Sequence, residues 1–116
     1  MQSQNTADTT DTTYNGWTNR ETWLVNLWLT NDQGTYDALA ELVSGIEPDV
    51  TEFGTISREH RIADALVGFV DDLIAPPDAD VPYGLAVDLI TTALGRVDWR
   101  ELADNYAEDF PFNPSR

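Results

Sequence analysis

The stretch from Tyr14 to Asp32 reads YNGWTNRETWLVNLWLTND and contains three of the four tryptophans of the chain, at positions 17, 23 and 28. Aromatic side chains of that size dominate the core that they enter. Thr18 and Glu21 fit the T-x-x-E capping box, in which the threonine hydroxyl and the glutamate carboxylate bond each other's backbone amides. This stretch therefore predicts the start of the first helix at Thr18.

Six of the seven residues from 23 to 29 are apolar and would cover most of the circumference of a helix. A helix that lies on a surface has a single apolar stripe, whereas one that is apolar nearly all round belongs in the interior. We therefore expect the first helix to be central, with Trp23, Leu27 and Trp28 buried and Trp17 partly open.

One uncharged polar line runs along this helix at helical spacing. It could be an interior hydrogen-bonding seam, its amides and hydroxyls satisfied by neighbouring groups. It could also be the floor of a contact site. Its members are Asn19, Thr22, Asn26 and Thr30.

Outward from this stretch, apolar residues recur at three- and four-residue intervals in four further segments, which predicts amphipathic helices. Asp98, with Glu101 three residues later, has the residue types of a second capping box. Residues 46–55 contain Pro48 and Gly54 and indicate a loop, with Val50 and Phe53 as anchors onto the core. The four predicted helices span about residues 35–44, 57–75, 82–94 and 98–109. We expect each helix to bury its apolar stripe. In chain order the stripes are Tyr36, Leu39, Ala40, Leu42 and Val43; Ile62, Leu66, Phe69, Val70 and Leu73; Leu85, Ala86, Leu89, Ile90 and Ala93; and Trp99, Leu102, Ala103 and Tyr106.

The predicted fold is all-α, a compact bundle of about five helices around the buried, tryptophan-rich first helix. Residues 1–13 are rich in Thr and Asp and cannot bury enough apolar surface to become ordered. Tyr14-Asn15-Gly16 then predicts a turn. We expect a disordered tail at residues 1–13, one helical domain at 14–110 and a C-terminal tail at 111–116.

The charge is strongly one-sided, with 21 acidic and 6 basic residues and a formal net charge of −15. All six basic residues are arginines, and Asp outnumbers Glu. Such self-repulsion destabilises a compact state in low salt, but in molar salt the screening length falls to about 3 Å. The composition favours a halophilic origin.

The same charge argues against direct binding to nucleic acid, which requires a basic face. The chain has no cysteine, so it has neither disulfides nor a thiolate metal site. No apolar run has the length of a membrane span or of a signal-peptide core. We expect a cytoplasmic protein that does not enter membranes.

The sequence contains no arrangement that indicates catalysis or a bound cofactor. The only histidine, His60, has Asp64 one turn away, but a metal needs more ligands, and a surface histidine is expected. The aspartates around residues 71–88 lack the spacing of a calcium-binding loop. Nucleotide-binding glycine motifs and the G-x-S-x-G motif of serine hydrolases are missing. We expect no enzyme, no cofactor and no metal.

Four carboxylates line the outer face of the last predicted helix, where residues four apart are about 6 Å apart along the axis. Such a line could imitate the phosphates of DNA and occupy the DNA-binding channel of another protein. An acidic surface adapted to salt would show the same residues. The four are Glu101, Asp104, Glu108 and Asp109.

The run NGWTNRETWLVNLWLTND resembles the N-G-W-x-N-x-E-T-W-x-V-x-L-W-x-x-N-D opening of a family of small uncharacterised proteins found in phages, plasmids and haloarchaea. The later run DLITTALGRVDWRELADNY is similar to the closing segment of that family. The resemblance implies a mobile-element setting, in which small acidic proteins often block a host enzyme, and transfers no activity and no functional residue.

Three hypotheses about function follow. The first is a non-enzymatic protein-binding module of a halophile or its mobile element, possibly an acidic DNA mimic that inhibits a host DNA-handling enzyme, so that the partner is a host protein. The second is a small-ligand binder or enzyme that uses the polar line of the first helix with Arg20 or Glu21. The third is a structural homodimer or virion accessory protein. The sequence favours the first.

Overall fold

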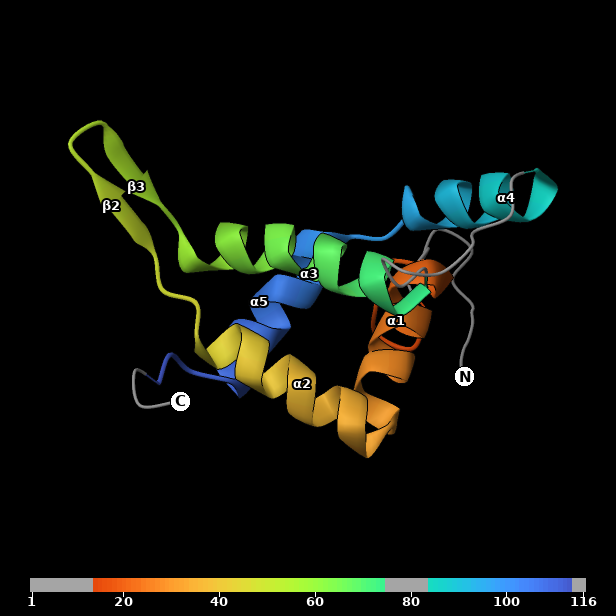
Figure 1. Ribbon diagram of the computed structural model, residues 1–116, viewed down its shortest axis with the longest axis horizontal. Coiled ribbons are helices and arrows are strands. Elements are labelled where there is room, and N and C mark those ends of the chain that lie inside the picture. The colour runs from red at the N-terminus through yellow and green to blue at the C-terminus, as the bar shows by residue number, and fades with distance from the viewer. Residues whose placement is uncertain (1–13, 75–83, 114–116) are drawn as a thin grey trace.

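The computed structural model describes residues 14–74 and 84–113. Within these residues the protein is mostly helical, as predicted, and also contains a two-stranded antiparallel hairpin (Figure 1). The elements in chain order are α1 (Arg20–Asn31), α2 (Gln33–Ser44), β2 (Asp49–Thr51), β3 (Gly54–Ile56), α3 (Arg58–Ile74), α4 (Leu85–Leu94) and α5 (Trp99–Asp109). The predicted tail at residues 1–13 and the end of the C-terminal tail, at 114–116, lie outside the described residues, as does 75–83.

The core lies where α3 and α5 pack against each other and against α2 and the last turns of α1. In α3 the buried residues Ile62, Leu66 and Val70 are four apart, so they form one stripe, as the apolar spacing predicts. Leu73, predicted to extend that stripe, is 51% exposed. The stripe predicted for the last helix is confirmed. In the second helix Leu39 and Val43 are buried, whereas Tyr36, also predicted to be buried, is exposed. The buried apolar residues are Leu29, Leu39, Val43, Ile62, Leu66, Val70, Val97, Leu102, Ala103 and Tyr106.

The prediction of a buried, central first helix was wrong. Within α1, Thr22 and Leu29 are the buried residues, whereas Trp28 is 68% exposed and Leu27 is exposed as well. Trp17 and Trp23 are partly buried, and the Trp23 ring lies 4.9 Å from that of Tyr14. The apolar residues circle the helix, but its neighbours cover one side of it, so the rest of its apolar surface faces outward.

The start of α1 also differs from the prediction by one residue. Asn19, not Thr18, is the N-cap, and its side-chain oxygen accepts a hydrogen bond from the Thr22 amide at 2.9 Å. The predicted turn before the helix is confirmed, because Asn15 and Gly16 both have positive φ, at 49° and 89°. Asn and Gly are the residue types that adopt this conformation most readily.

The segment predicted as a loop with core anchors is a hairpin. Its strands pair Asp49 with Ile56 and Thr51 with Gly54, and it projects away from the helices (Figure 1). Phe53, in the turn, is 93% exposed, and Val50 is 73% exposed, so neither anchors the segment to the core.

Arg58, at the start of α3, ties together the C-terminal ends of two other helices. Its guanidinium donates hydrogen bonds to the carbonyls of Val43 and Ile46 at the end of α2. It also donates to those of Ala107 and Phe110 at the end of α5. The last turn of a helix leaves carbonyls without an amide partner four residues on, and Arg58 supplies donors there. The Val43 carbonyl also accepts from the Ile46 amide at 3.1 Å.

The chain after α5 runs back along α2. The Asn113 amide donates to the Ser44 carbonyl at 2.8 Å, and the Phe110 ring packs against Tyr36 and Tyr106. The first residues of the predicted C-terminal tail, 111–113, therefore lie against the helical body.

Candidate functional site

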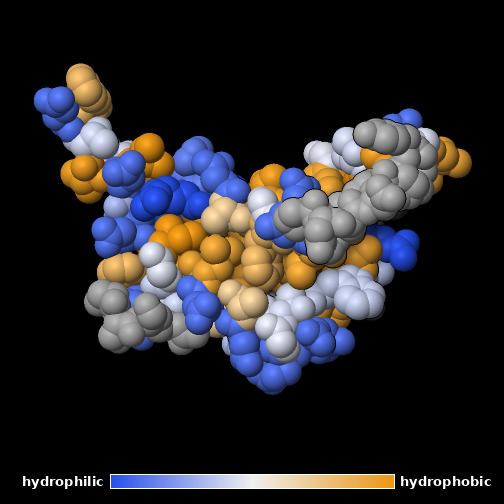
Figure 2. Space-filling view, viewed as in Figure 1, coloured by the Kyte–Doolittle hydropathy of each residue, from blue (hydrophilic) through white to orange (hydrophobic). Residues whose placement is uncertain are grey.

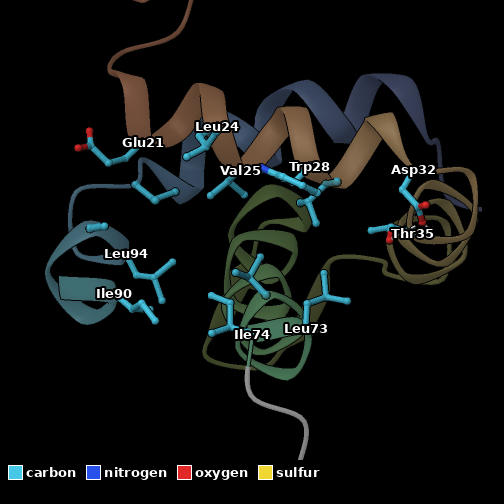
Figure 3. Close-up of a pocket in the computed structure, with 14 residues that line it drawn as sticks. Glu21, Leu24, Val25, Trp28, Asp32, Thr35, Leu73, Ile74, Ile90 and Leu94 are labelled. Atoms are coloured by element: carbon cyan, nitrogen blue, oxygen red, sulfur yellow. Dashed lines mark hydrogen bonds between the residues drawn. The ribbon is translucent and has the colours of Figure 1, made fainter. Parts of the chain in front are cut away.

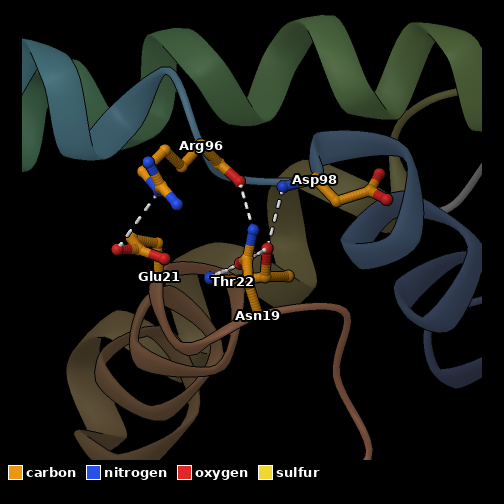
Figure 4. A network of polar contacts seen from close by, with 5 residues as sticks. All are labelled: Asn19, Glu21, Thr22, Arg96 and Asp98. Atoms are coloured by element: carbon orange, nitrogen blue, oxygen red, sulfur yellow. Dashed lines mark hydrogen bonds and ion pairs between the residues drawn. The ribbon is translucent and has the colours of Figure 1, made fainter. Parts of the chain in front are cut away.

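The first two residues of the polar line, Asn19 and Thr22, lie between the start of α1 and the segment that leads into α5 (Figure 4). The Asn19 side chain donates to the Arg96 carbonyl at 2.7 Å, and its oxygen also accepts from the Thr22 hydroxyl. The fully buried Thr22 hydroxyl in turn accepts from the Asp98 amide at 2.8 Å. These side chains join two segments more than seventy residues apart in sequence, and their polar atoms face each other.

The next two residues of the polar line, Asn26 and Thr30, lie in different environments. The Asn26 side-chain oxygen accepts a hydrogen bond from the Tyr106 hydroxyl at 2.7 Å. Burial, and secondarily the negative charge of Asp109, holds the pKa of Tyr106 well above its usual range. Thr30 is exposed and donates to the Asn26 carbonyl of its own helix. Three of the four predicted residues thus form an interior seam, and Thr30 lies outside it.

The carboxylates of α5 are also in different situations. Glu101 accepts from the Thr18 amide, at 3.0 and 3.2 Å, and so holds the segment before α1 against α5. Asp104 pairs with Arg100 at 2.8 Å, and this contact raises the pKa of Arg100. Glu108 and Asp109 are exposed. Asp98 caps α5, as predicted, by accepting from the Glu101 amide.

A groove of about 500 Å³ opens on the other side of α1 from the polar seam. Three helices form its walls: α1, the C-terminal end of α3, and α4. In Figure 3, Ile90 and Leu94 of α4 face Ile74 of α3 below α1. The apolar lining residues are Leu24, Val25, Trp28, Leu29, Val70, Leu73, Ile74, Ile90, Ala93, Leu94 and Val97.

The charged residues among those that line the groove are two carboxylates, one near each end of α1. Glu21 lies 3.7 Å from the guanidinium of Arg96, which is largely exposed. Asp32 caps α2, and hydrogen bonds from the amide and then the hydroxyl of Thr35 lower the pKa of Asp32. Asp32 therefore stays ionised, and the groove is apolar along its length and acidic at its ends.

The sequence prediction missed this groove, because it assigned the apolar residues of both α1 and α4 to the interior. In α4, Leu85 and Leu89, predicted to face inward, are 75% and 60% exposed. The space-filling view shows hydrophobic side chains gathered on the surface over the middle of the molecule, with others near the hairpin and at α4 (Figure 2). The spacing of apolar residues identifies the apolar face of a helix, but it does not show whether another element covers that face.

Neither a metal cluster nor a membrane helix is found in the part of the chain that the structure describes. No group of three or more potential metal ligands comes together within residues 14–74 and 84–113. His60 is exposed, as expected, and lies 3.5 Å from Asp64. None of the described helices combines the length and the apolar character needed to cross a bilayer.

Fold and groove together define a small, acidic, mostly helical protein with an open apolar groove. Residues 10–92 match a family described as a family of unknown function (DUF7249), and the chain belongs to that family. The matched region contains α1, α2, the hairpin, α3 and most of α4 and ends before α5. It includes most of the groove lining, but not Ala93, Leu94 and Val97. Neither a curated protein nor a solved structure matches the chain.

Proposed function

We propose that this protein is a non-enzymatic module that binds another protein through the groove between α1, α3 and α4. The observation that carries the proposal is the exposure of Trp28 at an apolar groove. Contiguous apolar surface on a monomer marks an interaction site, and tryptophan is enriched among the residues that contribute most to binding. The partner we propose is a host protein, in a halophile or in a mobile element that it carries.

The second hypothesis, a ligand or enzyme site on the polar line of α1, has less support. Asn19, Thr22 and Asn26 bond groups of the protein itself, and the groove opens on the opposite side of the helix. A catalytic group has to reach a substrate, whereas the Thr22 hydroxyl has no exposure. The homodimer hypothesis predicts a doubled mass in light scattering. Repulsion between two acidic chains opposes dimer formation in low salt.

The DNA-mimic form of the proposal depends on the carboxylates of α5. Glu101 and Asp104 are engaged in contacts within the protein, although Asp104 is exposed, and Glu108 and Asp109 are exposed as well. The groove is therefore the better-supported contact surface, and mimicry is the narrower proposal. An experiment distinguishes binding through the groove from mimicry: duplex DNA displaces the partner of a DNA mimic but not a partner held in the groove.

A capture experiment tests the proposed function. The immobilised full-length chain, its Trp28→Ser variant and its Phe53→Ser variant are exposed to host lysate in the salt of the host. Phe53 is the matched control, because it is an exposed aromatic residue on the hairpin, away from the groove.

We expect one protein to be recovered by the wild type and by Phe53→Ser and lost with Trp28→Ser, and to bind again as a purified pair. Displacement of that protein by duplex DNA supports mimicry, and retention argues against it. Recovery of no protein, or equal recovery with both variants, contradicts the proposed function.

A further inference from the structure

The length of the groove and the chemistry of its lining restrict what can occupy it. It follows α1 from Glu21 to Asp32, eleven residues, which corresponds to about 16 Å at the rise of an α-helix. Between these carboxylates the lining is apolar apart from Thr35, and Trp28 lies in that interval. An occupant has to bury apolar surface over about three helical turns and place positive charge near the ends.

The walls determine the backbone conformation of a peptide occupant. All three are helices, whose amides and carbonyls bond within the helix except at the ends, so the groove offers no strand edge for pairing. A peptide that entered as an extended chain would leave buried backbone groups without partners, which is costly. A helix satisfies its own backbone and presents side chains three and four residues apart.

Charge distinguishes a foreign helix from a second copy of this chain. A second copy has 21 acidic and 6 basic residues and would bring mostly carboxylates to the acidic ends of the groove, where charges in direct contact are screened less than distant ones. The Glu21 carboxylate is only partly neutralised by Arg96, at 3.7 Å, and a cation of the occupant would share it. Complementarity therefore favours a cationic partner.

We propose that the groove binds a cationic amphipathic helix of a partner protein, about three turns long, with an apolar stripe against Trp28 and Leu24 and basic residues near Glu21 and Asp32. This inference rests on the proposed function, because it names the occupant of the same groove. The apolar stripe supplies most of the affinity, and the basic residues fix the orientation and add a salt-dependent attraction.

The test uses synthetic peptides and the full-length chain. The probe is an amphipathic peptide of Leu, Ala and Lys, with leucines at i, i+3, i+4 and i+7 and lysines at both ends. One control peptide has the same composition in scrambled order, which removes the apolar stripe but keeps the charge. A second has glutamates in place of the lysines, which keeps the stripe and reverses the charge.

Binding is measured by calorimetry and by the shifts of the four tryptophan indole N–H signals. We expect the probe to bind with a stoichiometry of one and to shift the Trp28 signal most, the assignment being fixed by Trp28→Ala. Both control peptides should bind at least about tenfold more weakly.

Protein variants separate the groove from general attraction to an acidic surface. Trp28→Ala should weaken binding of the probe at least about tenfold, and Phe53→Ala should leave it within about twofold. Glu21→Gln with Asp32→Asn should weaken it more than Glu52→Gln with Asp49→Asn, which removes the same charge from the hairpin. Asparagine can still cap α2 in place of Asp32.

The inference is overturned if the probe does not bind, if the scrambled peptide binds equally well, or if Trp28→Ala and Phe53→Ala have equal effects. A partner that is captured through Trp28 but is not displaced by the probe leaves the proposed function standing and removes this inference. Concentration-dependent dimerisation that Trp28→Ala abolishes would assign the groove to a second copy instead.

Discussion

The Thr22 hydroxyl is buried and satisfies the amide of Asp98 across the joint between α1 and α5. Replacing it in Thr22→Val keeps the shape but leaves that amide without a partner. We expect a loss of about 1–3 kcal/mol in the free energy of unfolding, measured by urea denaturation. Thr30→Val is the matched control on the same helix. Its hydroxyl is exposed and should contribute less than about 0.5 kcal/mol. Equal effects would contradict the division of the polar line into seam and surface.

Arg58 is the side chain that joins the ends of α2 and α5. Arg58→Met removes hydrogen bonds to four carbonyls, and we expect a loss of about 2–4 kcal/mol in the free energy of unfolding. Arg58→Lys should recover only part of it, because an ammonium group lacks the planar fork that reaches several acceptors. Arg61→Met carries the same change of charge and breaks one exposed bond, to Glu47. A comparable loss in Arg61→Met would show that charge, not the four carbonyls, accounts for the effect.

Because of Tyr106, we expect the free energy of unfolding to fall at alkaline pH. Its pKa is raised in the folded protein, so its contribution is complete below the unfolded value of about 10 and falls as pH rises above it. Above that pH the unfolded chain releases the phenolic proton while the folded protein retains it, which favours unfolding. We expect tyrosinate absorbance from Tyr106 to appear only together with the loss of helical circular dichroism. In Tyr106→Phe the decline in stability above pH 10 should be shallower, and an identical decline would contradict the assignment.

The ends of the helices show what local sequence can and cannot specify. The T-x-x-E pattern predicted Thr18 as the cap of α1, but Asn19, the next residue, is also a favoured cap and bonds both the Thr22 amide and the Arg96 carbonyl. The Glu101 carboxylate, expected to bond the Asp98 amide, instead accepts from Thr18. Contacts between distant segments decided both cases, and spacing within one helix cannot show them.

The effects of Asn19→Ala and Thr18→Ala on stability show which of the two residues caps α1. Asn19→Ala should lower the free energy of unfolding by about 1–2 kcal/mol, because α1 loses its cap. Thr18→Ala should cost less than about 0.5 kcal/mol, since the structural role of Thr18 comes from its backbone amide. Thermal unfolding followed by circular dichroism measures both. A larger loss in Thr18→Ala would restore the capping box predicted from the sequence.

The elements were predictable to different degrees. Ile62, Leu66 and Val70 are covered by neighbouring helices, and their spacing located them. The same spacing also placed Leu73 in that stripe, although Leu73 lies open at the groove. The apolar surface of α1 and α4 is wider than the neighbouring elements cover, and no periodicity shows which part remains open. The exposed Phe53 follows the same principle: a hydrophobic residue in a short loop gains burial only if the loop folds back, and the hairpin does not.

The whole molecule has an excess of fifteen negative charges on a body with a small core. We expect helical content and thermal stability to rise from low salt to molar KCl, because screening weakens the repulsion among carboxylates. Circular dichroism in increasing KCl measures this, and sucrose is the control, because it favours compact states without screening charge. Folding that is independent of KCl, or that responds equally to sucrose, would contradict the proposed halophilic adaptation.

The proposed binding surface requires that Trp28 on α1 is open to solvent, and the solvent accessibility of the four indoles tests this directly. A neutral paramagnetic co-solute is added to the full-length chain, and relaxation of each indole signal is measured with and without the captured partner. We predict that Trp28 is relaxed far more than the partly buried Trp99, and that the partner protects Trp28. A Trp28 signal as shielded as that of Trp99 in the free protein, or one that the partner leaves fully accessible, would contradict the assignment of the groove as the binding surface.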